Sequence, residues 1–107
     1  MKEPLDFRNC SPVSICNYFQ THVDVGTCPE DYYCGITNNV ENNLQRHGVE
    51  EYLACVRCAS FEISAEVERL LGEKKFDIGN PNNEAGNGGV KNSTIVYMIK
   101  KGNGFIR

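Results

Sequence analysis

Residues 31–52, DYYCGITNNVENNLQRHGVEEY, gather side chains whose types and spacing could carry out chemistry. Tyr33 lies in a stretch typical of a short strand, and an Asn-rich turn leads from it into a helical pattern. On that helix Asn43 and His47 recur at four-residue spacing and share one face, and Arg46 is the only lysine or arginine. Tyrosine and histidine can hold or transfer a proton, although a histidine at a helix end more often binds the last carbonyl groups. The segment therefore predicts a site at the strand-to-helix junction.

Capping residues and hydrophobic periodicity predict the elements that position these side chains. The expected elements are a helix at about 12–22 begun by Ser11 and Pro12, a strand at Tyr32–Thr37, a helix begun by Asn38 or Asn39 and ended by Gly48, a strand at Tyr52–Phe61, a short helix from Ser64 to Gly72, an Asn/Gly-rich loop at about 77–92 and a strand at Ser93–Ile99. This order predicts an α+β fold with a small antiparallel three-stranded sheet, flanked by helices and preceded by an extra N-terminal helix.

Length and composition predict one domain in a reducing compartment. A chain of 107 residues forms one modest core, so we expect a single domain over 1–107, with its core at about 31–101. The first residues lack the apolar stretch of a signal peptide, and no run approaches the roughly 20 apolar residues that cross a bilayer. We therefore expect a cytoplasmic protein without a membrane partner.

The six cysteines are expected to be free thiols, because a reducing compartment disfavours disulfides. Cys55 and Cys58 have the spacing of a metal or redox motif, but both fall in an expected strand. Residues three apart on a strand point to opposite faces, so the two sulfur atoms would not meet at one ion. Cys28 and Cys34 are spaced too widely to complete such a site, and we expect buried or half-buried thiols.

Charge is distributed unevenly along the chain, whose net charge is −3. Residues 1–54 hold three Lys or Arg against eight Asp or Glu, whereas residues 90–107 hold four basic residues and no acid. A basic face could contact nucleic acid, and the candidates are Lys91, Lys100 and Lys101. Alternatively, these residues form a solvated tail that keeps an edge strand from pairing.

The stretch YYCGITNNVENNLQRH resembles the GIY-YIG nuclease family. In that family a Tyr-x-Gly strand runs into a helix, a later helix carries a glutamate, and an asparagine follows. Tyr33-Cys34-Gly35 matches the second half of the name motif, Glu68 matches the glutamate, and Asn80 matches the asparagine. The first half, a Gly-Ile-Tyr strand that forms a hairpin with the Tyr-x-Gly strand, is not found before Tyr33. The chain is thus similar to a degenerate, small stand-alone member of the family.

The resemblance covers roughly residues 32–100 and implies a chemistry. A GIY-YIG nuclease cleaves a phosphodiester with one divalent ion, Mg²⁺ or Mn²⁺, which Glu68 would hold while Tyr33 orients the attacking water. The family's arginine, which neutralises charge on the phosphate, corresponds to Asn43 here. Loss of one such donor costs about 10²- to 10³-fold in rate. Arg46 could replace it only in an unusual pose.

Three hypotheses follow from the sequence. The first is a GIY-YIG nuclease-fold domain with impaired catalysis that acts by binding nucleic acid, such as DNA, or a protein. The second is an active metal-dependent DNA endonuclease that uses Tyr33, Arg46 or His47, and Glu68. The third is a protein-interaction module in which the Asn/Gly-rich loop and the thiols have no chemical role.

Overall fold

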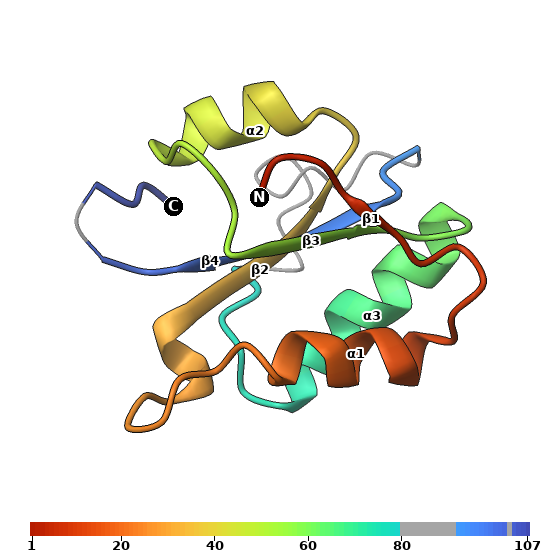
Figure 1. The fold of residues 1–107 in the computed structure, drawn as a ribbon, viewed down its shortest axis with the longest axis horizontal. Coiled ribbons are helices and arrows are strands. Elements are labelled where there is room, and N and C mark those ends of the chain that lie inside the picture. The colour runs from red at the N-terminus through yellow and green to blue at the C-terminus, as the bar shows by residue number, and fades with distance from the viewer. Residues whose placement is uncertain (80–91, 103) are drawn as a thin grey trace.

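The computed structural model describes residues 1–79, 92–102 and 104–107, and these form an α+β fold (Figure 1). The elements are β1 (Leu5–Asp6), α1 (Pro12–Gln20), the 3₁₀ turn η1 (Pro29–Asp31), β2 (Tyr32–Thr37), α2 (Val40–His47), β3 (Ala54–Arg57), α3 (Phe61–Glu73) and β4 (Ile95–Lys100). Asn80, Lys91 and most of the loop expected at about 77–92 lie outside the described residues.

The four strands form one mixed sheet in the order β1-β3-β4-β2. The last strand in the chain, β4, lies in the middle and pairs antiparallel with both β2 and β3. The expected three-stranded antiparallel sheet is therefore present, but β1 pairs parallel with β3 and makes the sheet four-stranded and mixed. A strand of two residues is too short to give a hydrophobic period, which is why the sequence did not indicate it.

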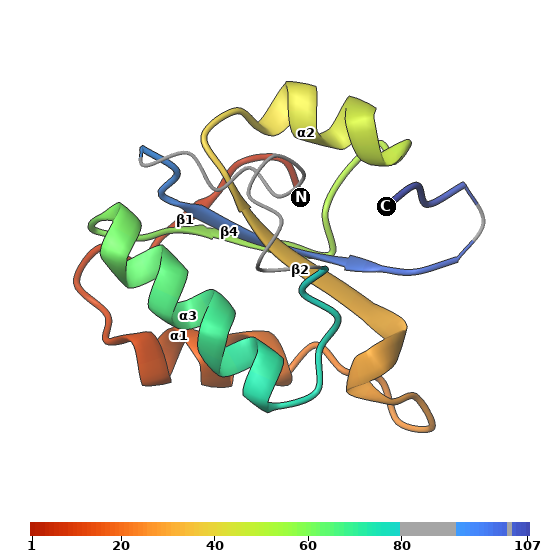
Figure 2. The same cartoon turned by 180° about the vertical axis from the view of Figure 1, so that it is seen from behind.

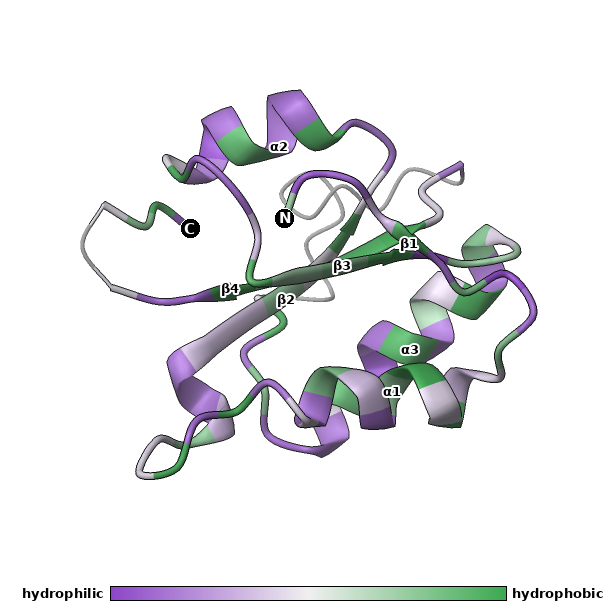
Figure 3. Cartoon of the chain, viewed as in Figure 1, coloured by the Kyte–Doolittle hydropathy of each residue, from purple (hydrophilic) through white to green (hydrophobic). Residues whose placement is uncertain are grey.

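Helices cover both faces of the sheet. In Figure 1, and from behind in Figure 2, α1 and α3 lie together on one face and α2 lies alone on the other. Because side chains alternate along a strand, Tyr32 and Cys34 belong to the core beneath α1 and α3, whereas Tyr33 belongs to the core beneath α2. Figure 3 shows the hydrophobic centre of the sheet and the largely hydrophilic α2.

The predicted start of α1 and both predicted ends of α2 are confirmed, whereas α1 ends at Gln20 instead of about residue 22. Ser11 Oγ accepts a hydrogen bond from the backbone N–H of Ser14, with proline at the first helical position. Asn39 Oδ1 accepts from the N–H of Asn42 and so begins α2. Gly48 ends α2 with a φ of 72°, in the left-handed region that favours glycine. These caps fix where the chain enters and leaves α2.

The third helix begins earlier than expected. Ser60, rather than Ser64, caps it by accepting from the N–H of Ile63. Helix α3 thus takes over Phe61 from the expected strand Tyr52–Phe61, which shrinks to Ala54–Arg57. Ser64 is buried inside the helix, where its hydroxyl donates to the Ser93 carbonyl oxygen at 2.7 Å. Gly72, expected as the stop, lies inside the helix too.

The cysteines behave as the strand pattern predicts. All six are free. Cys55 belongs to the core beneath α2 and Cys58 to the core beneath α1 and α3, so the two thiols do face opposite sides of the sheet. In the part of the chain that the structure describes, no helix has the length and apolar character needed to cross a membrane.

Candidate functional site

The junction between β2 and α2 rests on a close contact between two strands. Tyr97 on β4 lies opposite Gly35 on β2. A Cβ atom at Gly35 would lie 2.5 Å from Tyr97 Oη and 2.8 Å from Tyr97 Cζ, so the tyrosine side chain crosses directly over the glycine. Any larger residue at position 35 would occupy that space. Gly35 therefore lets the Tyr97 hydroxyl reach the underside of α2.

Beneath α2, Tyr97 belongs to a buried chain of hydrogen bonds. Tyr52 Oη donates to Asn43 Oδ1 at 2.7 Å, and Asn43 Nδ2 donates to Tyr97 Oη at 3.4 Å. His47 Nδ1 lies 2.7 Å from the Ile106 carbonyl oxygen, which can only accept, so Nδ1 carries the proton. His47 Nε2 then accepts from Tyr97 Oη at 2.8 Å. All the bonds in the chain consequently run in one direction.

This chain of bonds occupies the polar atoms of Asn43 and His47. Burial lowers the pKa of His47, against the opposing effect of the Ile106 carbonyl, so the imidazole stays neutral. Burial also raises the pKa of Tyr97, which keeps its hydroxyl protonated. His47 is fully buried and both its ring nitrogens are bound, so in this arrangement it cannot act as a base toward a substrate.

Tyr33 differs from Tyr52 and Tyr97 because no side chain or carbonyl of the described residues binds its hydroxyl. Its ring packs against the rings of His47 and Phe105 and is 4% exposed. Within the described residues the Tyr33 hydroxyl makes no hydrogen bond. Every fully buried polar side-chain atom in that part of the chain has a hydrogen-bond partner. The described residues therefore leave the Tyr33 hydroxyl without a hydrogen-bond partner. Tyr32 faces the other core, and its hydroxyl is held by the loop of residues 24–27.

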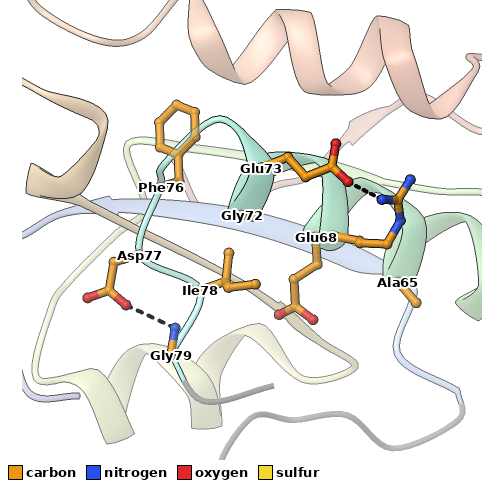
Figure 4. Close-up of a pocket in the computed structure, with 9 residues that line it drawn as sticks. Ala65, Glu68, Gly72, Glu73, Phe76, Asp77, Ile78 and Gly79 are labelled. Carbon is orange, nitrogen blue, oxygen red and sulfur yellow. Dashed lines mark hydrogen bonds and ion pairs between the residues drawn. The ribbon is translucent and has the colours of Figure 1, made fainter. Parts of the chain in front are cut away.

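A groove of about 540 Å³ opens along the β2 edge of the sheet, between α3 and the chain at 76–79 (Figure 4). The backbone of Asp77 borders it by pairing with β2: Asp77 N–H donates to the Tyr32 oxygen at 3.0 Å, and Cys34 N–H donates to the Asp77 oxygen at 2.9 Å. Its lining includes Ala65, Glu68, Gly72 and Ile78. The groove therefore lies next to the edge strand β2, with Asp77 between them.

Glu68 projects from α3 into this groove (Figure 4). The carboxylate is half-buried, and in the described part of the chain it has neither a hydrogen-bond partner nor a counter-ion. Burial raises the pKa of Glu68 to about 7. Glu66, two residues earlier, forms a 2.7 Å ion pair with Arg69, and this hydrogen bond lowers the pKa of Glu66. Of the two glutamates, Glu68 is the one at which a bound cation would relieve an uncompensated charge.

Charged side chains from several segments act on the Tyr33 hydroxyl. Burial is the main cause of its raised pKa; the positive charges of Arg46 and Arg107 lower that pKa, and the negative charges of Glu68 and Asp77 raise it. The charge of Glu68 therefore affects the pKa of Tyr33, although α3 and the Tyr33 ring are on opposite faces of the sheet. The edge of β2 is where the two faces meet.

Asp77 is the most strongly bound carboxylate of this edge. Burial alone would raise its pKa, but hydrogen bonds from Arg107, Lys101 and the Gly79 N–H outweigh burial and hold the pKa well below its usual range. Lys101 Nζ lies 2.9 Å from Asp77 Oδ2. Both Lys101 and Lys100, which lies 3.1 Å from Asp24, are therefore ion-paired, and they could contact a phosphate only through their remaining N–H groups.

The structure brings some of the predicted residues together and separates others. Glu68 lines the groove together with Asp77, and Arg107, which pairs with Asp77, lies over the Tyr33 ring. The exposed Arg46 acts on Tyr33 from α2. Asn43 is apart from them, because its amide is bound beneath α2.

Sequence reasoning missed Tyr97, Asp77 and Arg107. Tyr97 gave one signal, an aromatic residue in a strongly β-branched strand, but its partner Gly35 is 62 positions away. The ion pair between Asp77 and Arg107 had no local pattern that could have indicated it.

Within the described residues, a metal ion at Glu68 would be held through one protein carboxylate. Among the described residues no group of three His, Cys, Asp or Glu side chains gathers around a common point. Mg²⁺ commonly keeps several waters and binds through one or two carboxylates, so the open, uncompensated Glu68 fits that mode. Asp77, engaged by two basic side chains, is poorly placed to be a second ligand.

Comparison with protein-family models, with curated proteins and with solved structures finds no match. The fold and the site nevertheless define a class: a small α+β domain in which, among the described residues, a tyrosine hydroxyl and a half-buried carboxylate near one sheet edge have no partner.

Proposed function

We propose that this chain is a GIY-YIG-like domain with impaired catalysis that acts by binding nucleic acid. The observation that carries the proposal is the position of β4 beside β2. In the family, a Gly-Ile-Tyr strand forms a hairpin with the Tyr-x-Gly strand. Here Tyr97-Met98-Ile99 of β4 lies antiparallel to Tyr33-Cys34-Gly35, although β4 follows β2 in the chain instead of preceding it. Tyr97 of β4 lies opposite Gly35, and this antiparallel strand beside the Tyr-x-Gly strand supports the comparison with the family's hairpin.

The state of Asn43 supports the loss of efficient catalysis. An amide carries no charge with which to neutralise a phosphate, and both ends of this amide are bound by tyrosine hydroxyls. Positive charge directed at a developing oxyanion is commonly the largest catalytic contribution, and one missing donor costs about 10²- to 10³-fold. A domain that keeps the fold but not this charge is better suited to binding than to cleavage.

Two groups remain available to a ligand at the β2 edge. The Tyr33 hydroxyl can donate a hydrogen bond to a phosphate oxygen, and Glu68 can hold a hydrated Mg²⁺ or Mn²⁺. Such an ion would supply positive charge to a phosphate oxygen when bound. Because Glu68 is held on a helix and Tyr33 on a strand, both are positioned before a ligand arrives.

Cleavage and binding assays test this proposal. Plasmid and single-stranded DNA are incubated with Mg²⁺ or Mn²⁺ and with wild type, Glu68→Gln or Glu66→Gln. We expect a salt-dependent shift of labelled oligonucleotides and no cleavage that depends on Glu68. Glu66→Gln is the matched control, because it removes an exposed carboxylate from the same helix.

The active endonuclease is the second candidate, and the uncompensated Glu68 carboxylate favours it. Cleavage by wild type and Glu66→Gln, but not by Glu68→Gln, would establish that activity in place of the first proposal. Cleavage that is equal in all three proteins indicates a contaminating nuclease. Absence of nucleic-acid binding even at low salt would remove both candidates and leave the protein-interaction hypothesis.

A further inference from the structure

The Arg107 side chain lies over the ring of Tyr33. Its guanidinium carbon is 5.7 Å from the centre of the Tyr33 ring, a cation–π arrangement. Two of its nitrogens hydrogen-bond the Asp77 carboxylate, with Nη2 2.9 Å from Oδ1. A guanidinium has five N–H groups, so this fork leaves others unused while it fixes the plane of the group. The side chain is 58% exposed, and the remaining donors are accessible to a ligand.

The chain at 104–107 is held against the end of α2 by contacts that do not involve the Arg107 side chain. Ile106 N–H donates to the His47 carbonyl oxygen at 2.8 Å, and His47 Nδ1 donates to the Ile106 oxygen. The rings of Phe105 and His47 stack with centres 5.5 Å apart. A Cβ atom at Gly48 would lie 2.7 Å from the Gly104 oxygen, so these backbones approach closely. The main chain leading to Arg107 is thus fixed on α2.

Charge at this point is positive in balance. Asp77 is shared by Arg107 and Lys101, whose two positive charges exceed its charge by one, and Glu68 also acts on the Tyr33 hydroxyl with a negative charge. Arg46 adds its field from α2. A phosphate that accepts a hydrogen bond from Tyr33 would therefore meet a preoriented guanidinium.

We propose that Arg107 contacts the phosphate of a nucleic-acid strand bound at Tyr33 and supplies the positive charge that Asn43 does not. This inference rests on the proposed function and names the residue that would carry it. Arg107 acts here as a binding residue, with Asp77 as the residue that positions it. Because the contact is to the backbone, its contribution is independent of base sequence.

The test measures binding of a labelled single-stranded oligonucleotide by fluorescence anisotropy at several salt concentrations. Wild type is compared with Arg107→Gln, Arg107→Lys and the matched control Arg8→Gln. Arg8 is an exposed arginine paired with Asp6, so its replacement removes the same charge far from the β2 edge. Near-ultraviolet circular dichroism reports whether the aromatic cluster around Tyr33 remains packed in each variant.

We expect Arg107→Gln to weaken binding about tenfold at low salt, as for the loss of one charge-assisted hydrogen bond. The slope of log K against log salt should fall by about 0.7, which corresponds to one phosphate contact on a single strand, and Arg107→Lys should restore the slope. Arg8→Gln should change neither quantity. Equal effects of Arg107→Gln and Arg8→Gln would overturn this inference and leave the proposed function standing. Failure of wild type to bind at about 50 mM salt would overturn both.

Discussion

Replacing Glu68 by glutamine removes a carboxyl group whose ionisation opposes folding. Burial raises its pKa from 4.5 to about 7, so the folded chain holds the proton more tightly than the unfolded chain does. Between these two values the unfolded state releases the proton first as pH rises. The contribution of Glu68 to the free energy of unfolding is therefore fully present below about pH 4.5 and is lost progressively as the pH rises to about 7. The glutamine variant has no proton to release and avoids this loss.

The size of the effect follows from the pKa difference. One pKa unit corresponds to about 1.4 kcal/mol, so the full difference would give roughly 3 kcal/mol. The groove is open to solvent on one side, which reduces the expected value to about 2 kcal/mol. Relative to wild type, Glu68→Gln should therefore gain about 2 kcal/mol more at pH 8 than at pH 4.

Urea unfolding of wild type, Glu68→Gln and Glu66→Gln at both pH values measures this gain. Glu66 serves as the control because Arg69 lowers its pKa; any contribution it makes is lost as pH falls, which is the opposite direction. Mg²⁺ at pH 8 should stabilise wild type and leave Glu68→Gln unchanged, because an ion bound only by the folded state stabilises it. If the pH dependence of Glu68→Gln matched that of wild type, Glu68 would titrate as an ordinary solvated carboxyl. The argument for a cation at this position would then fail.

Three further substitutions or labelling experiments test the packing around the site. Tyr97→Phe should lower the free energy of unfolding in urea by about 2 kcal/mol, because it leaves a buried histidine nitrogen without its donor. The control Tyr18→Phe removes a hydroxyl that has no hydrogen bond in the described residues, and it should change the free energy of unfolding by less than about 0.5 kcal/mol. Gly35→Ala should cost about 1–3 kcal/mol because its Cβ atom overlaps the Tyr97 hydroxyl, and a neutral result would show that the ring can move away. A thiol reagent should modify Cys10 and Cys28 rapidly and the four buried cysteines only on unfolding; fast reaction of more than two thiols would contradict the assigned burial.

Local sequence signals predicted much of the fold, because each depends only on residues close together in the chain. The strand Tyr32–Thr37 and the helix between Asn39 and Gly48 agree with the structure, since alternation, an N-cap and a left-handed glycine each act within a few positions. Two serines near the start of α3 were equally good caps by type. In the structure Ser60 is the cap, and Ser64 lies inside the helix, where its hydroxyl bonds the carbonyl oxygen of Ser93, 29 positions away. That choice depends on residues far away in the chain.

The site was harder to predict than the fold for the same reason. The periodicity of α2 correctly turned Asn43 and His47 inward, but it could not reveal that tyrosines from β4 and from the chain before β3 occupy their polar atoms. The sequence correctly placed Glu68 at the flank of α3. It could not show the desolvation that distinguishes Glu68 from Glu66, because that desolvation comes from the chain around the groove. Sequence spacing identifies candidates, and long-range contacts decide which of them stay available.

The place of β4 links the folding of this domain to the formation of its site. Both antiparallel pairings of the sheet include β4, yet β4 is the last strand in the chain. The contact of Tyr97 with Gly35, the hydrogen-bond chain beneath α2 and the docking of residues 104–107 all require β4 to be inserted. Residues before β4 can therefore build neither the complete sheet nor the complete site. A ligand that binds at Tyr33 and Arg107 must then stabilise the whole sheet rather than one loop, by about 2.7 kcal/mol at a hundredfold excess over its Kd.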